Sequence, residues 1–248
     1  MTAIDTLTPD AIAARLSGSP EERAAFVREA ADAGVAEAQA VFGQMLLDGT
    51  AVAADQQAAL GWFMKAAAQH HVMALNMVGR CYDLGWGTAV DKARAAECYR
   101  IAAERGLDWA MYNYATLLAL GDGVAEDKAA ALALLETVAA MDSGLASAKA
   151  INFVGSFAED GWACERDLAR AADCYTRAAE GGDFRGCFNH ARMLGAAGDL
   201  EAALDWLKQA GVRGNAAFLA KAEAWLAASD IAAFRTSGVA ALREGSRC

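Results

Sequence analysis

Thiol and imidazole side chains are the first candidates for chemistry in this chain of 248 residues. Cys187 and His190 stand three residues apart, so a helix would place both on one face, and Cys174 falls on the preceding helix. Thiolates and imidazoles are ligands of zinc, and Cys164 would be a distant fourth donor. The spacing matches no established zinc pattern, and residues 187 and 190 fall at core positions of the repeat described below. A metal-binding protein is therefore an alternative and not the main prediction.

The cysteines also indicate a compartment. No C-x-x-C pair occurs among the six, which are Cys81, Cys98, Cys164, Cys174, Cys187 and Cys248. All are predicted to be small core residues except Cys164, which falls in a loop, and Cys248, which is terminal. The stretch from Met1 to Asp5 has neither the basic nor the apolar segment of a secretory signal, so we predict a reducing, cytoplasmic location.

Motifs of catalysis are missing from the sequence. It has no Ser/His/Asp arrangement, no Walker loop and no dinucleotide fingerprint. The glycine pairs Gly85–Gly87 and Gly121–Gly123 are expected to lie in loops between helices, because no strand precedes them. We therefore predict that the chain is not an enzyme and holds no cofactor.

Composition narrows the class of protein further. The chain has 22 Lys and Arg against 32 Asp and Glu, a net charge of −10, which disfavours nucleic acid as a partner. Hydrophobic residues make up 56%, which excludes a disordered chain, yet no apolar run reaches the roughly 20 residues of a membrane helix. Pro9 and Pro20 are its two prolines and alanine is abundant, so an all-α fold without membrane insertion is predicted.

Glycine and aspartate recur together along the chain. The pairs are Gly49 with Asp55, Gly85 with Asp91, Gly121 with Asp127 and Gly161 with Asp167. Successive aspartates are 36, 36 and 40 residues apart. The glycine is suited to end one helix in a left-handed conformation, and the aspartate to cap the next helix. The pattern therefore predicts a repeated helix pair.

Small and large apolar residues recur in the same register. The small positions inside each first helix are Gly43, Gly79, Ala115, Gly155 and Ala191. The matching large positions in each second helix are Trp62–Phe63, Cys98–Tyr99, Leu134–Leu135, Cys174–Tyr175 and Trp206–Leu207. Small residues let two helix backbones approach closely, and one helix pair cannot bury its apolar face alone. The pairs are therefore expected to stack.

The predicted organisation is a single repeat domain over residues 1–248. A helical cap at 1–34 contains helices at about 9–16 and 20–33, and degenerate capping helices at 211–248 cover about 215–228 and 230–243. Five helix pairs fill residues 35–210. Their predicted bounds are 35–48 with 56–69, 71–84 with 92–105, 107–120 with 128–140, 146–159 with 168–180, and 183–196 with 200–210.

These repeats resemble the Sel-1-like repeat family, a relative of the tetratricopeptide repeat. The third unit carries Ala102-Ala-Glu-Arg-Gly106, Gly121-Asp-Gly-Val124 and Asp127-Lys-Ala129, and the first carries Trp62-Phe-Met-Lys-Ala-Ala67. The resemblance implies a right-handed α-solenoid of antiparallel helix pairs, with about five repeats plus helical caps. It also implies a bacterial, non-enzymatic scaffold or adaptor that binds another protein or peptide.

In superhelices of this kind the first helix of each pair lines a concave groove. The resemblance therefore assigns nine residues to partner binding: Asn76, Arg80, Trp109, Tyr112, Lys149, Asn152, Arg185, Phe188 and Arg192. The asparagines can hydrogen-bond an extended backbone, the aromatic rings offer rigid apolar area, and the cations suit a carboxylate. A partner with an acidic segment or a C-terminal carboxylate is predicted.

Alternatives remain open at this point. The arginines could instead pair with Asp83, Glu159 or Asp160 on the same face. The resemblance also admits an accessory subunit of a bacterial enzyme, such as an iron-dependent oxygenase in an iron-uptake context.

Overall fold

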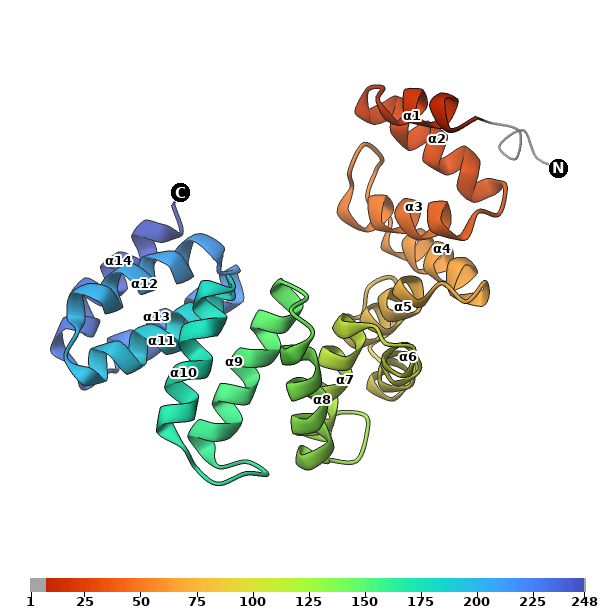
Figure 1. Cartoon of the computed structure of the whole chain (residues 1–248). Coiled ribbons are helices and arrows are strands. Elements are labelled where there is room, and N and C mark those ends of the chain that lie inside the picture. Colours follow the sequence, from red (N-terminus) through yellow and green to blue (C-terminus); the bar gives the residue numbers. More distant parts are fainter. Residues whose placement is uncertain (1–7, 248) are drawn as a thin grey trace. The chain divides into compact units, whose positions relative to one another are not determined.

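The computed structural model describes residues 8–247, and within that range it contains helices and no strand (Figure 1). The elements are α1 (Pro9–Leu16), α2 (Pro20–Asp32), α3 (Ala36–Asp48), α4 (Gln56–Ala68), α5 (Val72–Leu84), α6 (Lys92–Glu104), α7 (Asp108–Leu120), α8 (Lys128–Ala140), α9 (Leu145–Asp160), α10 (Leu168–Glu180), α11 (Phe184–Ala197), α12 (Leu200–Arg213), α13 (Ala216–Ala227), the π-helix η2 (Phe234–Gly238) and α14 (Val239–Gly245). The predicted helices at the N-terminus and in all five pairs are confirmed.

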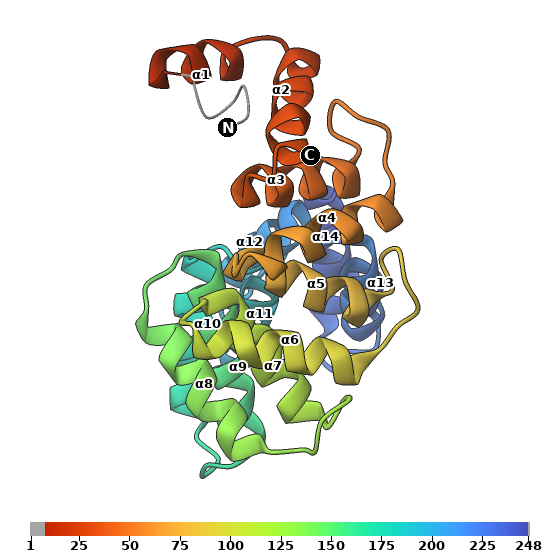
Figure 2. The ribbon, with the colours of Figure 1, turned by 90° about the vertical axis from the view of Figure 1, so that its right-hand side faces the viewer.

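The helices divide between two compact units, which are described separately. The first unit extends to Glu126 and contains α1 to α7, and the second begins at Asp127 and contains α8 to α14. In the first unit each helix packs against the next, as α5 does against α6, and in the second unit α8 to α12 do the same, as α9 does against α10, while α14 packs on α12. Figures 1 and 2 both show α5 beside α6 and α9 beside α10. The handedness of the predicted superhelix and the single-domain organisation stay predictions.

The recurrent aspartates cap the second helices as predicted. The side chain of Asp91 accepts a hydrogen bond from the backbone N–H of Arg94 at 3.0 Å. The same contact recurs at Asp55, Asp127 and Asp167. Each cap satisfies a backbone donor that the first turn of a helix leaves free.

The recurrent glycines end the first helices in the left-handed conformation, also as predicted. Their φ angles are 69° at Gly49, 75° at Gly85, 66° at Gly121 and 73° at Gly161. A side chain is strained at such φ values, which explains why glycine fills these four positions.

Close packing explains the ladder of small residues. A Cβ atom at Gly79 would lie 2.7 Å from the ring of Tyr99, and one at Gly155 would lie 2.8 Å from the ring of Tyr175. Both tyrosines are 1% exposed, so neither ring has room to move. The large residues that share their register are equally buried: Phe63, Leu135 and Leu207. These layers of side chains form the core of each unit.

The last predicted helix, at about 230–243, contains a feature that the sequence did not reveal. Its backbone widens into the π-helix η2 before α14 begins. The ring of Phe234, which is fully buried, lies against Gly195, where a Cβ atom would approach it to 2.2 Å. The wide turn places this ring in the core of the second unit, where it also meets Trp225.

Within residues 8–247, no helix has the length and apolar character that crossing a bilayer requires. Cys248, predicted to be terminal, and Met1–Leu7 lie outside the described residues.

Candidate partner-binding surfaces

The nine predicted binding residues fall into two groups, one in each unit. Those on α5 and α7 form the first-unit surface: Asn76, Arg80, Trp109 and Tyr112. Those on α9 and α11 form the second-unit surface: Lys149, Asn152, Arg185, Phe188 and Arg192.

An asparagine bridge joins the two helices of the first-unit surface. The Nδ2 of Asn113 on α7 donates to the Oδ1 of Asn76 on α5 at 3.1 Å. Asn76 is 3% exposed, and its own Nδ2 reaches only the Sδ of Met73, at 4.0 Å. Thioether sulfur is a weak acceptor, so this second hydrogen bond is a weak one.

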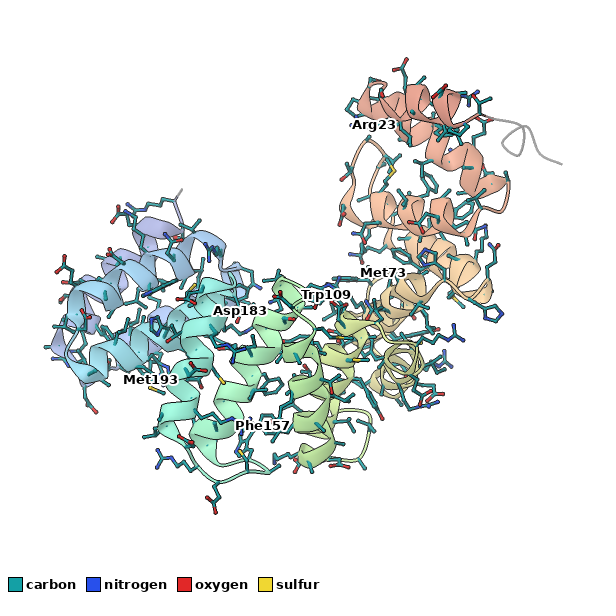
Figure 3. The ribbon with its side chains drawn as sticks, in the orientation of Figure 1. Arg23, Met73, Trp109, Phe157, Asp183 and Met193 are labelled. Carbon is teal, nitrogen blue, oxygen red and sulfur yellow. The ribbon has the colours of Figure 1, made fainter. Side chains whose placement is uncertain are left out.

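A cation and aromatic rings flank this bridge. The guanidinium of Arg80 lies 4.7 Å from the ring centre of Trp86 and contacts the Sδ of Met77 at 3.9 Å. Among the described residues no carboxylate forms an ion pair with Arg80. The rings of Trp109 and Tyr112 meet edge to face at 6.4 Å. Figure 3 labels Trp109 on α7 and the exposed Met73 on α5. The first-unit surface thus combines aromatic rings with one cation, Arg80, that has no ion pair among the described residues.

The second-unit surface has the same bridge. The Nδ2 of Asn189 on α11 donates to the Oδ1 of Asn152 on α9 at 2.8 Å. The Oδ1 of Asn189 accepts in turn from the Nε of Arg192 at 3.2 Å. Asn113 and Asn189 were not predicted as site residues. The signal was present, because each lies 37 residues after its partner.

Two of the predicted cations are neutralised inside the protein. Lys149 lies 3.4 Å from the carboxylate of Asp183, and their side chains are 15% and 1% exposed. Arg192 donates two hydrogen bonds to Glu159, at 3.2 and 2.8 Å. The alternative expectation, pairing on the same face, is thus confirmed for Arg192 with Glu159.

The carboxylate of Glu159 is held ionised by its neighbours. Burial alone would raise the pKa of Glu159, but hydrogen bonds from Arg192 and from the hydroxyl of Tyr175, at 2.6 Å, outweigh burial and lower that pKa. Burial likewise raises the pKa of Tyr175, so its hydroxyl stays protonated and donates. This network stabilises the second unit and leaves Arg192 little capacity for a partner.

The remaining two residues of the second-unit surface differ in access. Arg185 is exposed, lies 4.8 Å from the ring centre of Phe184 and forms no ion pair among the described residues. Phe188 is only 9% exposed, because Phe218 and Trp225 on α13 cover its ring at 5.9 and 5.5 Å. The free aromatic anchor predicted at Phe188 is therefore wrong. Trp225, 41% exposed, is the accessible ring instead.

The five described cysteines and His190 do not form a metal site. Cys81, Cys98, Cys164, Cys174 and Cys187 are all free thiols. Burial raises the pKa of Cys81 to about 11, so this thiol stays protonated and unreactive. No group of three or more metal-binding side chains occurs in the described part of the chain. The metal-binding alternative is therefore not supported.

His190 instead makes internal contacts, which gives a pH-dependent prediction. Its Nδ1 lies 3.1 Å from the hydroxyl of Thr176, and its ring packs on Trp206. Burial lowers the pKa of His190 below its ordinary value of 6.5, and Glu180 opposes this only in part. Below about pH 6.5 the unfolded chain therefore binds a proton that the folded chain does not, so stability falls as pH falls.

We expect His190→Gln to lose less stability than the wild type between about pH 7.5 and about pH 5.5. Urea denaturation at both pH values measures this difference. A wild type and a variant with the same pH dependence would contradict the prediction.

Comparisons with known proteins identify the repeat. The family model described as "Sel1 repeat" matches residues 36–71, 72–107, 110–143, 148–183 and 186–215. These segments coincide with the five predicted helix pairs. No curated protein matches the sequence of the chain.

Solved structures show the same fold. A Sel1 repeat protein from Oxalobacter formigenes is 25% identical with a TM-score of 0.72, over 93% of this chain and 92% of that one. A protective antigen of uropathogenic Escherichia coli strains, displaying an SLR fold, is 24% identical with a TM-score of 0.66. That match covers 96% of this chain but only 52% of the antigen, so this chain spans about half its length. An immunity protein from Pseudomonas aeruginosa is 14% identical with a TM-score of 0.56, over 82% of this chain and 75% of that one. Five matched repeats cover most of the sequence, and the chain belongs to the Sel1 repeat family.

Proposed function

We propose that this chain is a non-enzymatic scaffold that binds a partner protein or peptide on its first-unit and second-unit surfaces. Sel1 repeats mediate protein–protein interaction, which supports the general role. The observation that carries the assignment of the site is the state of Arg80 and Arg185. Both lack an ion pair among the described residues, although acidic side chains outnumber basic ones in the chain as a whole.

Unpaired arginines on an acidic protein favour an acidic partner. A guanidinium binds a carboxylate in two parallel hydrogen bonds, and such charge-assisted bonds are about twice as strong as neutral ones. Trp109 supplies rigid apolar area on the first-unit surface, and Trp225 does so in the second unit, and interface hot spots favour tryptophan and arginine. The partner is therefore a polypeptide that combines acidic and apolar side chains.

Reversing the two charges tests this function. We expect the double variant Arg80→Glu, Arg185→Glu to lose partner binding by about tenfold or more, since each arginine contributes roughly 1.5–3 kcal/mol to a charge-assisted contact. The measurement is affinity capture of partners from lysate, quantified by mass spectrometry, with circular dichroism to verify the fold.

The matched control is Arg177→Glu, on α10 and outside both surfaces. Arg177 is 54% exposed and forms a surface ion pair with Asp173. Its replacement by glutamate changes the net charge by the same amount per residue as the two test substitutions, but it should leave the capture of partners unchanged. Unchanged recovery of partners by the double variant would overturn the proposed function.

A further inference from the structure

The side of α13 that faces solvent carries almost no charge. The opposite side of this helix holds its buried residues, Ala222 and Leu226, which belong to the core of the second unit, and Phe218 packs against them. The exposed residues of α13 are alanines with two exceptions, Lys221 and Trp225. These alanines, with the one at the C-cap, are Ala216, Ala217, Ala220, Ala224, Ala227 and Ala228.

The helix that precedes the first repeat, α2, has the opposite character. Six of its exposed residues are charged: Glu21, Glu22, Arg23, Arg28, Glu29 and Asp32. The end units of a repeat array need a polar outer face, because no further repeat covers them. The exposed side of α13 is apolar instead, and exposed apolar surface of this kind marks a contact with another protein.

The C-terminal end of this face is hollowed. A cavity of about 350 Å³ is lined by Trp225, Ala228, Ser229, Asp230 and Ile231. The ring of Trp225, which is 41% exposed, forms one of its walls. Clefts that bind ligands measure about 300–1,000 Å³, so this cavity has room for side chains of a partner. Exposed tryptophans and pockets are the features on which interface hot spots are built.

Two opposite charges flank Trp225 along the chain. Lys221 precedes it by four residues and therefore shares its side of α13. Asp230 follows it by five residues and lines the cavity. Both charged residues are exposed, and neither forms an ion pair among the described residues. The face thus carries one positive and one negative group on either side of its aromatic ring.

This arrangement is complementary to itself. If two copies of α13 pack antiparallel about a twofold axis near Trp225, Lys221 of each copy comes opposite Asp230 of the other. A twofold interface uses the same patch on both subunits, so each of its contacts occurs twice. The exposed alanines allow the two helices to approach closely. A second copy therefore supplies the small side chains and both charges in the order that the face requires.

We propose that the chain forms a twofold-symmetric dimer through the solvent-facing side of α13. The alanines form the contact between the helices, and the cavity beside Trp225 receives side chains of the second copy. Pairs between Lys221 and Asp230 border the interface on both sides. The inference goes beyond the proposed function and does not depend on it, because Arg80 and Arg185 take no part in this contact.

The first test measures association of the purified full chain by sedimentation equilibrium, at concentrations from about 1 μM to about 1 mM. We expect a monomer–dimer equilibrium. Ala224→Glu should weaken it about 100-fold or more, because a dimer would bury two glutamates without partners. The matched control is Ala133→Glu, at an exposed alanine of α8 outside this face, which should dimerise as the wild type does. Circular dichroism verifies that both variants fold.

The second test exchanges the two charges. Lys221→Asp and Asp230→Lys should each weaken self-association about tenfold or more, since like charges then meet at both ends of the interface. An equimolar mixture of the two variants should associate as tightly as the wild type, because every contact between the two then joins opposite charges. Recovery in the mixture is specific to the antiparallel pairing.

Three outcomes would overturn the proposal. The first is a wild type that stays monomeric up to about 1 mM. The second is a dimer that Ala224→Glu does not weaken, since its contact would lie elsewhere. The third is a pair of charge variants that do not associate with each other. A monomeric wild type that captures a lysate protein, lost in Ala224→Glu, would assign the face to a different protein and also overturn the dimer. None of these outcomes affects the test of Arg80 and Arg185.

Discussion

Replacement of Gly87 by alanine is expected to lower the free energy of unfolding by about 2–5 kcal/mol. Gly87 lies in the loop between α5 and α6 at a φ of +69°, and a Cβ atom there would lie 2.2 Å from the backbone oxygen of Gln56 on α4. The left-handed conformation costs a side chain about 1–2 kcal/mol. Overpacking against a backbone that cannot move aside adds about 1–3 kcal/mol.

The matched control for Gly87→Ala is Gly106→Ala. Gly106 also has a positive φ, of +87°, but a Cβ atom there would meet nothing within 4 Å. We expect this variant to lose only the conformational part, about 1–2 kcal/mol. Urea denaturation followed by circular dichroism measures both losses. Equal losses would show that the contact between this loop and α4 does not contribute to stability.

Lys149→Met is expected to destabilise the protein by about 3 kcal/mol. The substitution leaves the carboxylate of Asp183, 1% exposed, without its cation. Removing one member of a buried ion pair costs about 3–5 kcal/mol, and the low end applies because Asp183 keeps the backbone N–H of Gly186 at 3.0 Å. In Figure 3, Asp183 lies in the second unit at the start of α11.

Two further variants make the Lys149 prediction specific. Arg185→Met removes an exposed cation without an ion pair, so it should change stability by no more than about 0.5 kcal/mol. Lys149→Met with Asp183→Asn removes both charges and should recover part of the loss. Thermal and urea denaturation of the three variants provide the measurement. A Lys149→Met protein as stable as the wild type would contradict the assignment of Lys149 to a buried pair.

The sequence alone predicted the fold because helix ends depend on local chemistry. A glycine such as Gly85 and an aspartate such as Asp91 act within a few residues of their own positions, so their types and spacing define the helix bounds directly. The small positions could be identified in the same way. Tyr99 covers Gly79, and a large residue recurs at the position of Tyr99 with the same spacing as the small residues. The predicted bounds accordingly agree with the observed ones within a few residues in the five pairs.

The chemistry of the surfaces depended on neighbours that the repeat pattern does not specify. Lys149 contacts Asp183, and Arg192 contacts Glu159, although the partners are 34 and 33 residues apart in the sequence. The pattern predicts which face a side chain occupies, but not whether a carboxylate on the adjacent repeat reaches it. Phe188 is covered by α13, whose degenerate sequence carries little of the repeat pattern. The asparagine bridges could have been found from their common 37-residue spacing.

The caps described above have a consequence for how such a chain can change in length. Each helix pair carries its own terminating glycine and its own initiating aspartate, so a whole repeat can be added or removed without altering the helix ends of its neighbours. The E. coli antigen, of which this chain covers 52%, is a longer member of the same fold. The addition of complete repeats thus leaves the local signals for each helix unchanged while the number of helix pairs increases.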